Sequence, residues 1–266
     1  MKKIILMSVL IAFIFSNSSY AIKLEKNETY SGLLKKIGNV QTDIILPNAD
    51  WELVALNDKS SRSISHMFAL EQDNQVAAII WLLQPTSISP TNDGQYILKS
   101  EDGICFDYDG DGPSESNHTR ADFKIIKLQQ GTGRCLLVQA FSDIGDWTFE
   151  QSTTFNQYRK QMKRTNVSYP DAMIWIDNVL YTKNNQIDYY IGINPAFASI
   201  ESTPNQDFFF SDWYKRNIKD FPEKDNYMKS VIRLSDQYFE SHYKNFNKRK
   251  PIDFTGLLEL IPEYNK

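Results

Sequence analysis

Three aspartates stand at alternate positions in a short acidic segment, Asp107, Asp109 and Asp111, and a glycine follows the second and the third. Carboxylates at alternate positions can turn their oxygens toward one point, and glycine permits the sharp bend that this requires. Ca²⁺ takes about six to eight hard oxygen ligands, and three aspartates supply part of that set. The segment therefore predicts a calcium site at Asp107, Asp109 and Asp111.

Over six residues this segment resembles the start of an EF-hand loop. His118 stands where the bidentate glutamate of such a loop belongs, and the flanking residues are typical of strands, so a complete EF-hand is not expected. The alternative is a solvated turn, in which Asp and Gly are common. A calcium ion held here would brace a surface loop rather than take part in a reaction.

Cys105 and Cys135 are the two cysteines of the chain. Two cysteines in an exported protein usually pair, and both lie in strand-like sequence, so we expect a disulfide between them. Two reduced thiols or a nucleophilic cysteine are the alternatives. A nucleophile needs a nearby histidine or helix N-terminus to lower its pKa, and neither is evident in the sequence.

The sequence shows no recognisable catalytic motif. It contains no His-Glu-x-x-His, no Gly-x-Ser-x-Gly, no phosphate loop and no dinucleotide fingerprint. The three histidines, His66, His118 and His242, are widely spaced. Whether the protein is an enzyme stays open, and the sequence favours a protein without catalytic activity.

Aromatic residues are dense in one later stretch, where Phe209, Trp213 and Tyr214 lie close together. Clusters of this kind are enriched at binding surfaces, so the three residues are candidates for ligand binding. The alternative is that they pack into the core.

Residues 1–21 have the three parts of a secretory signal: Lys2 and Lys3, an apolar run from Ile4 to Phe15, and small residues around Ala21. The run is shorter than the ~20 residues that span a bilayer, and no later segment is longer. We therefore expect a periplasmic or secreted bacterial protein, residues 22–266, with no membrane span after cleavage. The net charge of −4 of the full chain and its lack of a basic stripe argue against nucleic-acid binding.

Hairpins dominate the first two thirds of the chain. The patterns predict strand pairs over 65–83 around Asp73-Asn74, over 123–141, and over 172–194. Shorter strands are expected over 43–46 and 51–56, separated by a turn at 47–50. Helices are predicted over 149–166, 208–218 and 223–245, with a short one over 31–37.

This order predicts one α+β domain over residues 22–266, with a mainly antiparallel sheet built from hairpins and helices packed on one face. The function that fits is a soluble exported binding or accessory protein with a calcium loop. Its partner would be another protein or an envelope component. The competing hypothesis is a metal-dependent hydrolase acting on envelope material, with His118 and the Asp107–Asp111 carboxylates at its centre.

Overall fold

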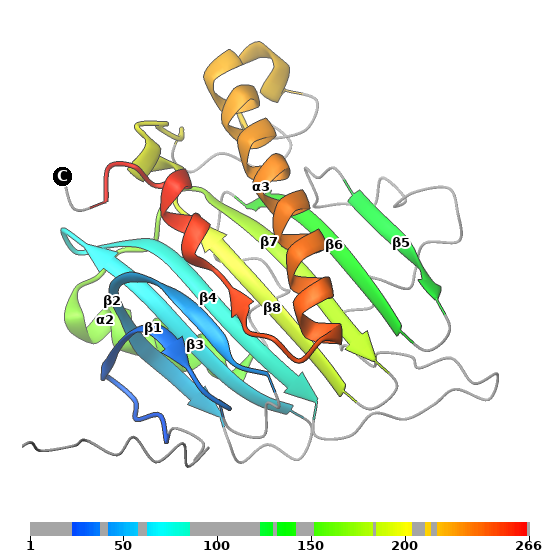
Figure 1. Cartoon of the computed structure of the whole chain (residues 1–266). Coiled ribbons are helices and arrows are strands. Elements are labelled where there is room, and N and C mark those ends of the chain that lie inside the picture. The colour runs from blue at the N-terminus through cyan, green and yellow to red at the C-terminus, as the bar shows by residue number, and fades with distance from the viewer. Residues whose placement is uncertain are drawn as a thin grey trace, which may run out of the picture.

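The structure is a computed structural model that describes residues 23–37, 42–57, 63–85, 123–129, 132–141, 152–182, 185–203, 211–213 and 217–264. One sheet runs through these residues (Figure 1). Its strands are β1 (Thr29–Leu34), β2 (Ile44–Asn57), β3 (Ser63–Gln72), β4 (Gln75–Pro85), β5 (Phe123–Gln129), β6 (Thr132–Phe141), β7 (Met173–Thr182), β8 (Asn185–Ile193) and β9 (Ile252–Asp253).

The sheet is two meanders joined edge to edge. Its strand order is β1-β2-β3-β4-β8-β7-β6-β5, and all neighbours in this order are antiparallel. β4 and β8 form the seam, with Ile80 opposite Ile191. β9 adds one parallel pair on β2. The expected α+β fold with an antiparallel sheet of hairpins is confirmed.

The predicted hairpins follow the turn chemistry of the sequence. Asp73 and Asn74 join β3 to β4 with φ of 54° and 59°, the left-handed region that Asn and Asp tolerate best among residues with a side chain. The apolar run of β4 is buried almost throughout, as a central strand covered on both faces should be.

Helices cover both faces of this sheet. α3 (Pro222–Asn247) lies across β6, β7 and β8 on one face, and α2 (Thr153–Thr165) lies behind β2 and β3 on the other (Figure 1). The expectation of helices on one face therefore holds only for α3 and the short helix η4 (Thr255–Leu260). The reason is that β3, β4, β7 and β8 are apolar on both faces, so each face needs a cover.

Strand alternation divides the core in two. On the α3 face, alternate strand residues such as Phe68, Ile80 and Ile176 belong to one buried cluster that also contains α3 residues, including Val231 and Phe239. On the α2 face, the intervening residues meet three side chains of α2. That second cluster includes Met67, Ile79, Trp81, Phe155, Tyr158, Met162 and Trp175.

Two sequence expectations near the N-terminus are wrong. The strands expected over 43–46 and 51–56 are not separate: residues 44–46 and 51–56 both belong to the 14-residue β2. The expected turn, Pro47–Asp50, is an irregular stretch of this strand. Tyr30 of β1 pairs with Trp51, but Gly32 pairs with Leu46, so the residues between them are skipped in the pairing. Residues 31–34 belong to β1 instead of a helix, and Gly32 takes φ of 66° at the register jump, where the strand bends.

Local signals set the ends of the helices. Ser152 caps α2 by accepting from the Phe155 N–H at 3.2 Å, and Asn166 ends it in the left-handed conformation. Pro222 opens α3, which continues to Asn247. The helix expected over 208–218 lies partly outside the described residues. In the described part of this range, Asp212 and Trp213 form a turn. The short helix η3 (Ile218–Asp220) begins at the last residue of the range.

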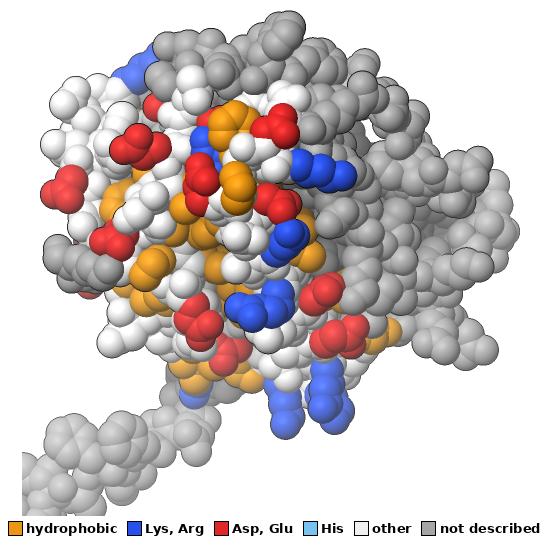
Figure 2. All heavy atoms as spheres, turned by 90° about the horizontal axis from the view of Figure 1, so that it is seen from above, with side chains coloured by type: hydrophobic (Ala, Val, Ile, Leu, Met, Phe, Trp, Pro, Cys, Tyr) orange, Lys and Arg blue, Asp and Glu red, His pale blue; other side chains and the backbone are white. Residues whose placement is uncertain are grey.

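The surface in Figure 2 carries acidic and basic side chains side by side, with hydrophobic side chains between them. None of the described helices is both long enough and apolar enough to cross a membrane. The predicted signal at 1–21 lies outside the described residues.

Candidate functional site

The sheet brings two carboxylates together on its α2 face. Glu52 of β2 stands opposite Ala69 of β3, and Glu71 follows two residues later on the same strand. Side chains two residues apart on a strand share a face, so Glu52 and Glu71 are diagonal neighbours across the β2–β3 pair. Both side chains are half-buried, so solvent reaches them.

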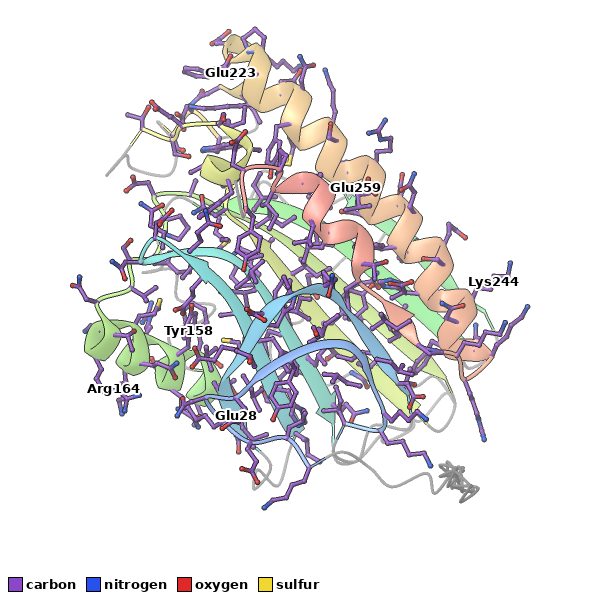
Figure 3. All side chains as sticks on the ribbon, turned by 60° about the vertical axis from the view of Figure 1, so that its left-hand side comes forward. Glu28, Tyr158, Arg164, Glu223, Lys244 and Glu259 are labelled. Carbon is purple, nitrogen blue, oxygen red and sulfur yellow. The ribbon has the colours of Figure 1, made fainter. Side chains whose placement is uncertain are left out.

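Two residues of α2 fix these carboxylates in place. Tyr158 donates its hydroxyl to Oε1 of Glu71 at 2.7 Å, and Nε2 of Gln161 donates to Oε1 of Glu52 at 2.6 Å. The i, i+3 spacing puts Tyr158 and Gln161 on one face of the helix. Figure 3 shows Tyr158 between α2 and the strands, whereas Arg164 points away from them. Glu52, Glu71, Tyr158 and Gln161 are called the acidic site below.

Burial and charge perturb the titration of this site. Burial raises the pKa of Glu71, the hydrogen bond from Tyr158 opposes that rise, and the neighbouring charge of Glu52 adds to it. Burial beside these carboxylates also raises the pKa of Tyr158 well above its usual value, so its hydroxyl keeps its proton. Within the described ranges, no lysine or arginine pairs with Glu52 or Glu71. The negative charge of the site is thus not neutralised there.

Gln161 leaves one acceptor of the site unused. The residue is 6% exposed, and its Oε1 is buried without a hydrogen-bond partner among the described residues. Exchanging the two amide atoms would set an oxygen against the Glu52 carboxylate, so the contact with Glu52 fixes the orientation. A buried acceptor without a partner costs about 1–3 kcal/mol. The acidic site therefore combines half-buried charges with an unsatisfied carbonyl oxygen.

The α3 face carries a different kind of polar cluster, a chain of hydrogen bonds through His242. Nε2 of His242 lies 2.6 Å from the Asp253 carbonyl oxygen, which only accepts, so Nε2 carries the proton. Nδ1 then accepts from the Tyr189 hydroxyl at 2.6 Å, and that hydroxyl accepts from Asn178 at 2.7 Å. Tyr238 stacks on the imidazole with ring centroids 4.6 Å apart.

Burial lowers the pKa of His242 to about 4, and the Asp253 carbonyl and charge offset this only in part. The imidazole is therefore neutral near pH 7, with both nitrogens engaged. A histidine held in this way links α3 to β8 and β9 and has no free nitrogen for a substrate.

A second polar cluster, where α3 begins, contains a buried ion pair. Lys224 contacts Asp212, with side chains 7% and 1% exposed, and Thr203 donates its N–H and hydroxyl to the same carboxylate. Burial alone would raise the pKa of Asp212, but the hydrogen bonds from Lys224 and Thr203 outweigh it and lower that pKa. Lys224 also lies over the ring of Phe221, 5.0 Å from its centroid.

The residues singled out from the sequence are only partly placed. Asp107, Asp109, Asp111, Cys105 and His118 lie outside the described residues, as do Phe209 and Tyr214. The calcium loop and the disulfide stay predictions. The backbone of Cys135 lies in β6, opposite Val179 of β7. Among the described residues, no group of three or more His, Cys, Asp or Glu side chains could hold a metal ion.

Trp213, one of the three aromatic candidates for ligand binding, packs in the core, which was the alternative interpretation of that stretch. Its side chain is completely buried against α3, and its ring nitrogen donates to Ser202 at 2.8 Å. In this position the indole is not available to a ligand. It packs edge to face with Tyr227, with ring centroids 6.4 Å apart.

The acidic site was not found by sequence reasoning. Glu52 and Glu71 belong to different strands, and only the β2–β3 register sets them side by side. One signal was available, because Glu52 interrupts the apolar run Trp51–Ala55, where a carboxylate is out of place. Comparison of the chain with protein-family models, with curated proteins and with solved structures gives no match.

Proposed function

We propose that the protein is an exported binding protein that recognises another protein or an envelope component through the acidic site. Export rests on the signal pattern of residues 1–21. Binding rests on the acidic site itself, where two half-buried carboxylates are held by buried partners yet lack a cation in the described part of the chain.

The other polar clusters support this choice by contrast. Lys224 compensates the charge of Asp212, and Tyr189 and Asp253 satisfy His242. Those groups complete their interactions within the fold. In the acidic site, the two carboxylates of Glu52 and Glu71 repel each other. Natural proteins keep such unfavourable arrangements chiefly at functional positions.

The proposal is tested by capturing a partner with the tagged, purified protein from an envelope extract of its own host. Wild type is compared with the double variant Glu52→Gln/Glu71→Gln, which keeps the shape of the site and removes its charge. Glu259→Gln on η4 is the control, because Glu259 is an exposed carboxylate on the α3 face (Figure 3).

We expect a protein or polymer that wild type and Glu259→Gln enrich equally, and that the double variant enriches at least tenfold less. Equal enrichment by all three proteins, or enrichment by none, would contradict the proposal. Circular dichroism checks that each variant is folded.

A hydrolase is the second candidate function, and the pKa of Glu71 favours it. Glycoside hydrolases use two carboxyl groups, of which one has a raised pKa and serves as general acid. Glu71 beside Glu52 has that pattern. Reducing ends released from purified cell-wall polysaccharide by wild type, and not by Glu71→Gln, would favour this candidate over binding alone.

A further inference from the structure

We infer that a basic corner of the molecule, separate from the acidic site, docks the protein on an anionic phospholipid membrane. The corner lies where three chain segments meet: the end of β1, the start of β2 and the link from α3 to β9 (Figure 1). Its exposed cations come from the first and third of these segments, and they are Lys35, Lys36, Lys248, Arg249 and Lys250.

Hydrogen bonds of one residue hold the three segments together. Oδ1 of Asp43 accepts from the Lys36 N–H at 3.1 Å, and the Asp43 carbonyl oxygen accepts from the Ile252 N–H at 2.9 Å. Ile44, the next residue, pairs with Leu34 on one side and with Ile252 on the other. Cations that stand far apart in the sequence therefore share one end of β2.

Carboxylates do not neutralise the basic corner in the described part of the chain. Among those residues, Lys35 and the three cations after α3 form no ion pair. Two carboxylates lie beside the corner, and both serve the backbone: Asp43 accepts from Lys36, and Asp253 accepts from the Thr255 N–H at 2.9 Å. Five cations beside two carboxylates leave a positive corner on a chain whose overall charge is −4. This segregation of charge favours an anionic partner.

The dipole of α3 does not account for the corner. Cations in the last turn of a helix are favourable, which explains Lys244. Figure 3 shows Lys244 near the end of α3, on the outside of the molecule. Arg249 and Lys250, however, lie beyond the end of the helix, and the two cations after β1 belong to another part of the chain.

Two cations of the corner occupy backbone positions that disfavour long side chains. Lys36 and Arg249 have φ of 47° and 53°, in the left-handed region. The other described non-glycine residues in that region have short polar side chains: Asn27, Asp73, Asn74, Asn166 and Ser199. Arg249 directly follows the C-cap of α3, where glycine is the usual residue. A charge kept where the backbone disfavours it indicates a role other than stability.

An exposed apolar side chain stands beside these cations. Leu33, 46% exposed, is the one large hydrophobic residue that the described part of the chain leaves exposed. It lies two residues before Lys35 and pairs across the strands with the half-buried Ile45. A membrane interface suits this combination, because an apolar side chain can enter the headgroup region while the cations contact lipid phosphates. A nucleic acid offers phosphates without an apolar layer and would leave Leu33 unused.

The test measures, by vesicle flotation, the binding of the protein purified from its own host. The vesicles are phosphatidylcholine alone, or phosphatidylcholine with about 30% phosphatidylglycerol as the anionic lipid. The corner variant removes three charges by Lys248→Gln/Arg249→Gln/Lys250→Gln. The α2 variant is the matched control and removes three exposed charges by Lys160→Gln/Lys163→Gln/Arg164→Gln. All proteins are made in the same way and carry the same N-terminus.

We expect wild type to bind the anionic vesicles at least tenfold more tightly than the neutral ones. This binding should be lost when NaCl rises from about 0.1 M to about 0.5 M. Each cation near an anionic membrane strengthens binding roughly fivefold, so the corner variant should bind at least tenfold more weakly. The α2 variant should bind within about twofold of wild type, and Leu33→Ser about threefold more weakly than wild type.

A single substitution separates the loss of charge from a loss of folding. Arg249→Gly removes one cation and places the usual residue at this left-handed position. We expect the midpoint of thermal unfolding to rise by about 2–4 °C, while binding to anionic vesicles weakens roughly fivefold. A variant that is more stable and binds more weakly cannot owe its weaker binding to unfolding.

Four results would overturn the inference: equal binding to anionic and neutral vesicles, binding that persists in high salt, equal losses in the corner and α2 variants, or full binding by Arg249→Gly. A DNA duplex at the same salt concentration supplies one further comparison. A duplex that displaces wild type from the vesicles, and that does not bind the corner variant, would assign the corner to a nucleic-acid interface instead.

Discussion

The two faces of the sheet handle polar groups in opposite ways. On the α3 face, an uncharged chain of hydrogen bonds runs from Asn178 through the Tyr189 hydroxyl and His242 to a backbone carbonyl, while Oδ1 of Asn178 has no partner among the described residues. On the α2 face, Glu52 and Glu71 are half-buried carboxylates without a paired cation in the described part of the chain.

The difference separates polar groups that stabilise the fold from polar groups that are available to a ligand. A buried, uncharged hydrogen-bond network rigidifies a core and is costly to disturb. A site that keeps two repelling carboxylates gains nothing for stability from their repulsion. If this contrast is right, variants on the α3 side should change stability strongly, and variants in the acidic site should change binding instead.

The largest effect is expected where α3 begins. Lys224→Met removes the cation from the buried Asp212 carboxylate and leaves that charge uncompensated. Breaking a buried ion pair from one side costs about 3–5 kcal/mol. We expect the free energy of unfolding in urea to fall by that amount.

Lys229→Met is the matched control, because Lys229 pairs with Asp225 at 2.5 Å on the exposed side of the same helix. Exposed pairs contribute about 0–1 kcal/mol. Equal losses for the two variants would show that burial does not distinguish the pairs.

A smaller effect is expected from protonation of His242. Its pKa of about 4 in the folded protein lies below the usual 6.5, so the unfolded chain takes up the proton first as pH falls. The stability that the neutral imidazole gives is complete above pH 6.5 and is lost as pH falls toward 4. The shift corresponds to about 3 kcal/mol.

His242→Gln keeps a donor and an acceptor at this position and removes the titration. The stability advantage of wild type over this variant should therefore shrink by about 3 kcal/mol between pH 7 and pH 4, measured by urea unfolding at each pH. A constant advantage would place the titration of His242 outside this pH range.

The smallest effect on stability is expected at the acidic site. The raised pKa of Glu71 means that its ionised form costs stability at pH 7, so Glu71→Gln should raise the free energy of unfolding, by less than about 1 kcal/mol. The gain should fade as pH falls and the carboxyl of wild type becomes protonated.

Urea unfolding of Glu71→Gln and of the control Glu259→Gln measures this gain. A loss of more than about 1 kcal/mol in Glu71→Gln would show that Glu71 stabilises the fold. That result would remove the contrast between the two faces.

Much of the fold was predictable because short-range patterns decide it. The hairpins at 63–85 and 173–193 follow from alternation and turn residues, and α2 and α3 follow from helical periodicity with their caps. The β2 strand was misread because Pro47–Asp50 looks like a turn, and the neighbouring β1 and β9 hold it in the sheet.

The acidic site was not predictable for a related reason. Its residues come from β2, β3 and α2, and no local pattern links Glu71 to Gln161. Sequence alone also cannot tell which face of a doubly apolar sheet a helix covers. Both facts arise from tertiary packing, which the one-dimensional pattern does not contain.

The parallel pair between β2 and β9 also affects how the chain folds. Ile44 and Ile45 meet Ile252 and Asp253, so the first long strand gains its last neighbour only when the C-terminal end of the chain is present. Pairing across such a sequence separation is slow and comes late. A polypeptide that leaves a ribosome or a narrow channel N-terminus first cannot close this part of the sheet until Ile252 and Asp253 have emerged.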